Sequence, residues 1–144
     1  MIRILAVGKL KDARLAGLAE DFARRIRPWA ELEIVELKDQ DPEREAAAML
    51  ARLGSAAGHG LTVAMDERGD PATSRELAAL LGAHGSLTFL IGGPDGLGPA
   101  VRARADRTLS LSPLTFTHET ARFLLLEQIY RGLAILRGHP YHRD

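Results

Sequence analysis

Four glycines within residues 92–98 make this segment a candidate ligand-binding loop. Glycine lets a backbone approach a ligand closely and adopt positive φ, so exposed amides here could bind carbonyls, ring nitrogens or hydroxyls. The segment lacks the Gly-Lys-Ser/Thr sequence of a Walker loop, and it follows the fourth expected strand rather than the first, unlike a dinucleotide-binding fingerprint. A tight strand-to-helix turn that requires glycine explains the segment equally well.

A second candidate segment, residues 110–118, is apolar but bordered by hydroxyl side chains. Leu114 and Phe116 could form walls around a flat aromatic ring while backbone groups bind its edge. The alternative is a buried connection between a strand and a helix. His118 and Arg122 lie four residues apart on one helix face, so they could point to the same site or simply begin a polar helix.

The last eight residues, 137–144, combine cations, imidazoles and a phenol. Aromatic side chains interleaved with basic ones are typical of single-stranded RNA recognition, by stacking and by contact with phosphates. A solvated terminus is the alternative interpretation. His139 and His142 could ligate a metal, but the sequence offers no third ligand nearby and no cysteine, so we expect no metal site.

Composition narrows the function classes further. The 144 residues predict a single domain, residues 1–144. The absence of cysteine excludes disulfides, thiolate zinc sites and a cysteine nucleophile. Because 19 basic and 19 acidic side chains cancel, affinity for nucleic acid requires a local basic patch. Arg24, Arg25 and Arg27 could form one, although a solvated helix end is the favoured interpretation. We expect neither a signal peptide nor a membrane span, and hence a cytoplasmic protein.

Strands and helices that alternate along the chain must position these segments. Hydrophobic periodicity and turn residues predict strands at residues 2–7, 32–37, 61–65, 87–91 and 108–111, with a turn at 58–60. The same patterns, with helix caps at Asp41, Thr73 and Thr117, predict helices at about residues 12–26, 42–53, 74–82, 99–105 and 118–136. This alternation predicts an α/β fold, a mainly parallel sheet with helices on both faces. Ligands bind at the carboxyl ends of such strands, where residues 65–69, 92–98 and 110–118 would meet.

The helix expected at residues 118–136 carries two neighbouring apolar stripes. Leu125 and Ile129 belong to one, Leu126 and Tyr130 to the other, and Leu133 adjoins both. A helix with so wide an apolar face requires two neighbours. It could be enclosed in the core of its own chain, or place one side on the sheet and the other on a second subunit. We favour the second interpretation.

Five motifs, taken together, resemble one known family. They are the start Ile-Leu-Ala-Val-Gly-Lys at 4–9, the Leu-Ile-Gly-Gly-Pro-Asp-Gly loop at 90–96, the hydroxyl-bordered segment at 110–118, Glu-Gln-Ile-Tyr-Arg at 127–131, and His-Pro-Tyr-His-Arg at 139–143. The sequence resembles the RlmH family of ribosomal large-subunit RNA (pseudouridine-N3)-methyltransferases, which belongs to the SPOUT class. The resemblance covers nearly the whole chain.

The resemblance implies a fold, a cofactor and a substrate. The fold is that of a SPOUT methyltransferase with a C-terminal trefoil knot, in a homodimer. The methyl donor is S-adenosylmethionine, and the substrate is a pseudouridine in 23S rRNA of the assembled ribosome. Matching the family's motifs residue by residue gives the expected cofactor-binding positions Met65, Gly93, Ser112, Pro113, Leu114, Thr115, Phe116 and Thr117. Thr117 stands where the family usually has proline.

The same resemblance, with residue type, implies the catalytic roles in the tail. We expect His142 to accept a proton or orient the base, Arg143 to bind an anion or phosphate, and Tyr141 to stack or donate a hydrogen bond. We expect the glycine loop and segment 110–118 to form one cleft, whose mouth the tail closes. The active site would be composite, because the tail of one subunit would reach the cofactor pocket of the other.

Two other functions remain open from the sequence. The chain could be a non-catalytic ribosome-binding or RNA-binding module that keeps the fold, or a SPOUT methyltransferase that acts on another RNA such as a tRNA. Labelled methyl transfer to ribosomes, free 23S rRNA or tRNA distinguishes these functions.

Overall fold

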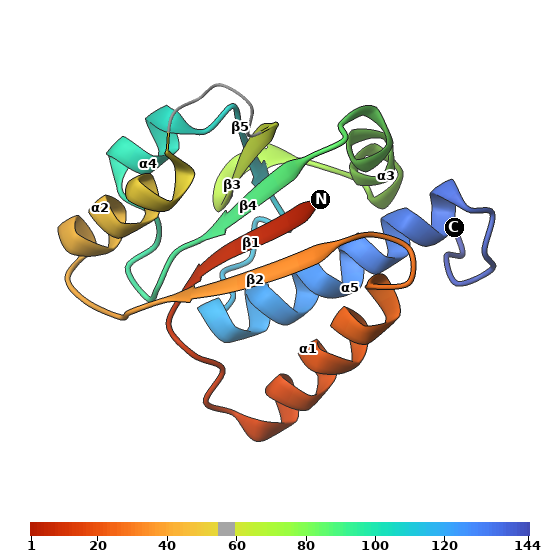
Figure 1. The fold of residues 1–144 in the computed structure, drawn as a ribbon, viewed down its shortest axis with the longest axis horizontal. Helices are drawn as coiled ribbons and strands as arrows, with labels where there is room; N and C mark the ends of the chain where they lie inside the picture. The colour runs from red at the N-terminus through yellow and green to blue at the C-terminus, as the bar shows by residue number, and fades with distance from the viewer. Residues whose placement is uncertain (55–59) are drawn as a thin grey trace.

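A computed structural model describes residues 1–54 and 60–144, and in them five parallel strands form one sheet (Figure 1). The strands lie in the order β2-β1-β4-β3-β5. Their bounds are β1 Ile2–Val7, β2 Leu32–Leu37, β3 Leu61–Pro71, β4 Leu87–Ile91 and β5 Arg107–Ser110. The predicted α/β fold with a parallel sheet is confirmed. The turn expected at 58–60 lies mostly outside the described residues.

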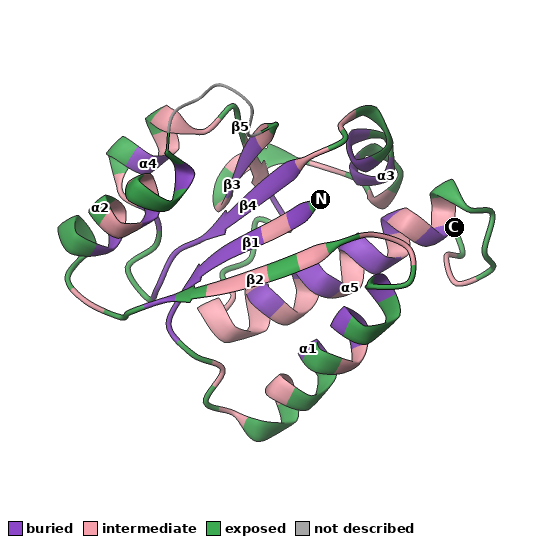
Figure 2. Ribbon diagram, viewed as in Figure 1, coloured by how far each residue is buried: buried purple, intermediate pink, exposed green. Residues whose placement is uncertain are grey.

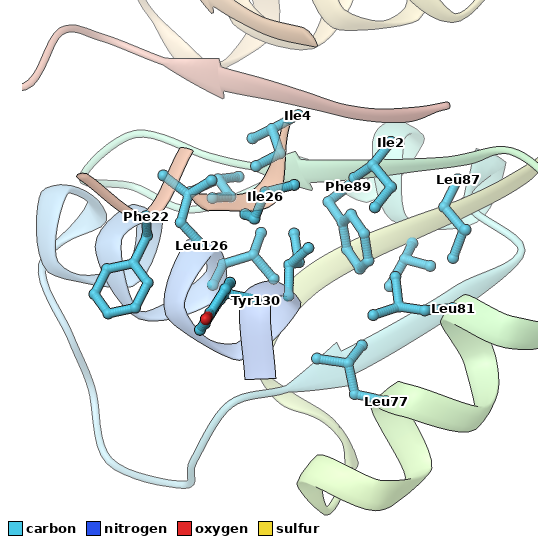
Figure 3. Close-up of a cluster of buried hydrophobic side chains, with 14 of the residues drawn as sticks. Ile2, Ile4, Phe22, Ile26, Leu77, Leu81, Leu87, Phe89, Leu126 and Tyr130 are labelled. Atoms are coloured by element: carbon cyan, nitrogen blue, oxygen red, sulfur yellow. The ribbon is translucent and has the colours of Figure 1, made fainter. Parts of the chain in front are cut away.

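Helices cover both faces of the sheet, as expected from the buried, apolar strands (Figures 1 and 2). Their bounds are α1 Ala13–Ile26, α2 Pro42–Leu53, α3 Ser74–Ala83, α4 Pro99–Arg104 and α5 His118–Leu136. On one face α5 packs between α1 and α3, and a large apolar core fills the space beneath them (Figure 3). On the other face α2 and α4 enclose a smaller core. No helix in the described part of the chain is long and apolar enough to cross a membrane.

Local caps explain where several helices begin. The Asp41 carboxylate accepts a hydrogen bond from the amide of Arg44 at 3.0 Å, and proline occupies the first turn of α2. Thr73 and Glu76 form a complete capping box at the start of α3. Thr117 accepts from the amide of Thr120 at 3.2 Å and caps α5. These three predicted caps are confirmed.

Strand β3 is longer than expected, and its extension shapes the candidate site. Its pairing with β5 shifts register, because Met65 and Asp70 both lie opposite Leu109. Residues 66–69 therefore bulge from the ladder at the carboxyl end of the sheet. The sequence prediction ended this strand at Met65, since the polar residues that follow break the apolar pattern.

The wide apolar face of α5 is buried within one chain. Leu125, Leu126 and Ile129 have no exposed surface, and Tyr130 is 7% exposed. Because α1 and α3 flank the helix and the sheet lies beneath it, the chain itself supplies the neighbours that we expected from a second subunit. The two stripes therefore give no support to dimerisation, which stays a prediction from the resemblance.

Candidate functional site

A cavity of about 210 Å³ lies between the end of β3, the start of α3, the segment after β5 and the middle of α5. Its walls are mainly apolar, with a few hydroxyl and amide groups among them. The residues that line it include Met65, Ala72, Ser74, Ser110, Phe116 and Gln128. Mainly apolar walls with a few polar groups are typical of small-molecule sites. Because such sites usually measure about 300–1,000 Å³, this cavity suits one ring of a ligand rather than a whole ligand.

Hydrogen bonds hold segment 110–117 against the bulge of β3. The hydroxyl of Ser110 lies 3.0 Å from the carbonyl oxygen of Glu67 and 2.9 Å from that of Ser112, and it donates to these acceptors. Thr115 Oγ1 donates to the Glu67 carboxylate. Ser112 Oγ accepts from the amide of Leu114 at 3.0 Å. The hydroxyls that border this segment therefore fix its backbone, and through it the wall of the cavity.

The structure places the expected cofactor residues unequally around this cavity. Met65 and Phe116 line it. Ser112 and Thr115 shape the loop that carries Phe116, whereas Thr117 caps α5. The others, Pro113, Leu114 and Gly93, do not line it; Pro113 and Leu114 are exposed, and Gly93 is buried elsewhere.

The glycine loop is a tight turn packed against the sheet. The amide of Gly96 donates to the carbonyl of Gly93 at 2.9 Å, and Gly96 has φ +75°. A Cβ at Gly93 would lie 3.1 Å from Val7 Cγ1 and 3.5 Å from Glu45 Oε1. This loop therefore contacts Val7 at the end of β1 and Glu45 in the first turn of α2, while segment 110–117 contacts β3. The cavity of about 210 Å³ is lined by residues of segment 110–117 and not by the glycine loop, so a cleft that joins both loops stays a prediction.

Gly92 should be the least replaceable residue of this loop. A Cβ at Gly92 would lie 2.4 Å from the carbonyl carbon of Gly96, a backbone atom that cannot turn away. We expect Gly92→Ala to lower the free energy of unfolding by about 2–3 kcal/mol, as overpacking does. Gly96→Ala is the matched control, because a Cβ there meets nothing within 4 Å and only the positive φ is strained, at about 1 kcal/mol. Urea denaturation measures both, and equal losses would contradict this explanation.

The first turn of α5 is anchored to the loop after β1. Arg122 is 3% exposed; its guanidinium donates to the carbonyl of Gly8 at 2.6 Å and to Glu36 at 2.5 Å. The Glu119 carboxylate accepts from the amide of Lys11 at 2.7 Å. His118 also faces Gly8, since its Nε2 lies 3.5 Å from the position of a Cβ there. His118 and Arg122 therefore converge on Gly8, and α5 begins at a fixed place.

Removing the Arg122 guanidinium should weaken this anchor strongly. We expect Arg122→Ala to cost about 3–5 kcal/mol of stability in urea denaturation, because the side chain is buried and ionic. Glu36→Gln should cost less, since the Glu36 side chain is 39% exposed and an amide oxygen can still accept from Arg122. A loss below about 1 kcal/mol for Arg122→Ala would show that this ion pair is no stronger than a surface pair.

The tail docks on α1 and α5 rather than extending into solvent. The ring of Tyr141 lies edge-on to Tyr130, with 4.7 Å between centroids, and the guanidinium of Arg131 lies 4.8 Å from the Tyr141 ring centroid. Trp29 stacks on Tyr130 at 5.0 Å and meets His139 edge-on at 5.4 Å. Aromatic contacts therefore hold the tail at Tyr141 and His139, and Tyr141 and His142 are half-buried, while the other residues of 137–144 are exposed to solvent.

Two hydrogen bonds favour one tautomer of the His142 ring. Arg131 Nη1 lies 3.1 Å from His142 Nδ1, and because a guanidinium only donates, Nδ1 accepts. His142 Nε2 carries the hydrogen and donates to Asp144 at 2.9 Å. The ion pair with Arg75 lowers the pKa of Asp144 to about 2. Arg143 is exposed and has no ion pair within residues 1–54 and 60–144.

Tyr141 is held in its protonated form. Burial, together with the hydrogen bond that Tyr141 Oη donates to Glu127 at 2.7 Å, raises the pKa of Tyr141 to about 12. A phenol with this pKa donates hydrogen bonds at neutral pH and does not act as a base.

The cavity and the tail share two structural elements. Gln128 lines the cavity and accepts a hydrogen bond from Ser74 Oγ at 2.7 Å. Its neighbour Glu127 holds Tyr141, and Arg75, next to Ser74, pairs with Asp144. Sequence reasoning on chemistry did not single out Glu127, Gln128 or Ser74. The available signal was a Glu-Gln pair within an otherwise apolar stretch of helix.

Other residues considered from the sequence have structural partners. Arg24 and Arg25 pair with Asp21, and Arg27 with Glu20, so the end of α1 is a partly neutralised surface, as favoured from the sequence. In the described residues no group of three or more His, Cys, Asp or Glu side chains could hold a metal ion.

Comparison with known proteins identifies the family. The family model described as "Predicted SPOUT methyltransferase" matches residues 1–142. A protein from Synechococcus sp. (strain RCC307) named "Ribosomal RNA large subunit methyltransferase H" is 49% identical over 146 residues, 99% of this chain and 95% of that protein. A protein of the same name from Symbiobacterium thermophilum is 42% identical over 159 residues, which cover 99% of this chain and 99% of that protein.

Solved structures support the fold. A probable methylase family protein from Haemophilus influenzae Rd KW20 has a TM-score of 0.60 at 11% identity, over 99% of this chain and 70% of that one. A probable methyltransferase from Bordetella pertussis Tohama I has a TM-score of 0.55 at 17% identity, over 92% of this chain and 93% of that one. With the family model and these relatives spanning nearly its whole length, the chain belongs to the SPOUT methyltransferases and, within them, to the ribosomal RNA large subunit methyltransferase H family.

Proposed function

We propose that this methyltransferase transfers a methyl group from S-adenosylmethionine to N3 of a pseudouridine in 23S rRNA of the assembled ribosome. The observation that carries the proposal is the 49% identity, across 99% of this chain, to a relative named for ribosomal RNA of the large subunit. Tyr141 and His142 contact Glu127 and Arg131 on the helix that carries Gln128, a residue of the cavity wall, and Arg143 adds an exposed cation to the tail. Because the proposed substrate is ribosomal RNA, we expect the protein to act in the cytoplasm.

The cavity suits the adenine ring of the cofactor. Met65 and Phe116 offer apolar surfaces to a flat ring, and the Gln128 amide and Ser110 hydroxyl offer hydrogen bonds to its edge. At about 210 Å³ the cavity would hold one ring of the cofactor and not the whole molecule. When bound, the cofactor supplies an electrophilic methyl group on a sulfonium. The protein must then place the target nitrogen in line with that methyl group, and such positioning supplies much of the rate.

The tail residues would handle the proton and the charge of the target base. N3 of the target base must lose its proton. The lone pair on His142 Nδ1 would accept this proton once the hydrogen bond from Arg131 to Nδ1 is broken. The exposed guanidinium of Arg143 could stabilise the anionic ring or bind a phosphate. With its pKa raised to about 12, Tyr141 would donate a hydrogen bond or stack against the base.

The proposal includes an assembly. The resemblance implies a homodimer, a C-terminal trefoil knot and a single domain over residues 1–144. In the dimer the tail of one subunit would complete the site at the cofactor pocket of the other.

Labelled methyl transfer tests the proposed function. Purified protein is incubated with methyl-labelled S-adenosylmethionine and with ribosomes, free 23S rRNA or tRNA, all from cells that lack the modification. We expect label in 23S rRNA of intact ribosomes, as 3-methylpseudouridine by mass spectrometry of digested nucleosides. Ribosome binding without transfer would identify a non-catalytic module, and label in tRNA alone would identify another target; either result would overturn the proposal.

A further inference from the structure

Glu127 accepts three hydrogen bonds from three directions. Tyr141 Oη donates to Oε1 at 2.7 Å, Arg131 donates to the same oxygen at 2.6 Å, and Gln128 Nε2 donates to Oε2 at 2.8 Å. The Glu127 side chain is 14% exposed. Tyr141 and Arg131 both donate to Oε1, and the negative charge of the carboxylate strengthens both bonds.

These bonds extend in both directions along the surface of α5. The Arg131 guanidinium donates one hydrogen bond to Glu127 and another to His142 Nδ1. Glu127 therefore influences the position of His142 through Arg131. The Gln128 amide donates to Glu127 and accepts from Ser74, and Gln128 and Ser74 both line the cavity. Glu127 thus lies between the cavity wall and the two tail side chains that we assign to the chemistry.

A further contact joins the tail to the start of α3. His142 donates to Asp144, and Asp144 pairs with Arg75, the residue after Ser74. Hydrogen bonds that share partners fix relative positions better than a single contact does. The tail is therefore held on both α5 and α3 of its own chain.

We infer that Glu127 is a positioning residue that holds Tyr141 and His142 in the geometry in which they meet the target base. The role rests on the proposed function and deepens it, since it assigns the control of tail geometry to a group that touches no reacting atom. An ordinary ion pair between Glu127 and Arg131, four residues apart on one helix, would contribute little to stability and nothing to the position of the tail.

Glu127→Gln tests the inference, because the amide keeps the shape but loses the charge and gains two donors. We expect kcat for methyl transfer to fall about a hundredfold, as a 1 Å misplacement does, with little change in KM for S-adenosylmethionine. Glu127→Asp keeps the charge and should restore part of the rate. Glu20→Gln, in α1, is the matched control, since Glu20 is exposed and pairs with Arg27 at 3.5 Å, away from the tail bonds of Glu127.

Two readouts follow the tail without any methyl transfer. Burial and Glu127 together raise the pKa of Tyr141 to about 12, so absorbance titration of the tyrosines should show a lower pKa for Tyr141 in Glu127→Gln, where burial alone still raises it. Trp29 is the single tryptophan, and its contact with His139 makes quenching by acrylamide a measure of tail docking. Quenching should increase in Glu127→Gln and stay unchanged in Glu20→Gln.

The outcomes separate this inference from the proposed function. Wild-type kcat and quenching in Glu127→Gln would overturn the inference, and so would equal losses of cofactor affinity and rate, which indicate a general structural role. If the wild-type protein transfers no methyl group to any RNA, the proposed function fails. The titration and the quenching still decide whether Glu127 holds the tail.

Discussion

A chain that ends at Pro140 should bind S-adenosylmethionine and transfer no methyl group to ribosomes. The deletion removes the three side chains assigned to the target base, Tyr141, His142 and Arg143, and it leaves Met65 and Phe116 on the cavity wall. General acid–base catalysis and charge stabilisation each supply about 10²–10⁴ in rate, so their combined loss should reduce transfer to background. Labelled transfer to ribosomes measures the activity, and calorimetry measures the cofactor affinity, which should change less than about tenfold.

A milder variant guards against loss of folding. Tyr141 packs against Tyr130 and Phe22 in the main core, so the deletion removes packing as well as chemistry. The double variant His142→Ala, Arg143→Ala keeps that packing and should still lose at least about 10²-fold in rate. Arg44→Ala, on α2 across the sheet, is the matched control for a lost surface arginine. Normal methylation by either tail variant would contradict the assignment.

Local sequence was sufficient to predict the elements of the fold. The cap at Asp41 with proline behind it, and the capping box of Thr73 and Glu76, involve residues that are neighbours in the chain. Their energetics do not depend on the rest of the protein, so a sequence pattern predicts them directly. The alternation of such helices with apolar strands was then enough for a parallel sheet.

Residues whose environment comes from distant segments were not predictable in the same way. The sequence pattern places Arg122 in a polar helix start, and it is buried because Gly8, just after β1, and Glu36, in β2, both contact it. The extension of β3 past Met65 depends on pairing with β5, at Leu109. The hydrophobic periodicity of a single segment does not predict these contacts, because they form between segments that are distant in the sequence.

The candidate site was predictable in part, for the same reason. Met65 and Phe116 were named by resemblance and line the cavity. Ser74 and Gln128, which also line it, come from α3 and α5 and meet across 54 positions of sequence. The glycine loop drew attention through composition, and its glycines serve the close backbone approach between Gly92 and Gly96. A glycine-rich composition indicates that the backbone of a segment lies close to another group. It does not indicate whether that group is a ligand or another part of the chain.

Filling the cavity should abolish cofactor binding while the fold survives. Ala72 lines the cavity and is only half-buried, so Ala72→Phe can place a ring in the space without forcing the core apart. Burial of one flat ring contributes about 3 kcal/mol, which is about a hundredfold in Kd, so calorimetry should find S-adenosylmethionine bound at least that much more weakly. Ala72→Ser, which adds a single oxygen, is the matched control and should bind nearly as the wild type does.

The same variant tests which subunit completes the site. Ala72→Phe chains have an intact tail and no usable pocket, whereas chains that end at Pro140 have an intact pocket and no catalytic tail. If the tail of one subunit serves the pocket of the other, mixed dimers contain one complete site, and mixing the two inactive proteins should restore labelled transfer. If each tail serves its own pocket, as the shared contacts of Glu127 and Gln128 within one chain allow, no mixture regains activity. Wild-type affinity for S-adenosylmethionine in Ala72→Phe would mean that the adenine ring binds outside this cavity.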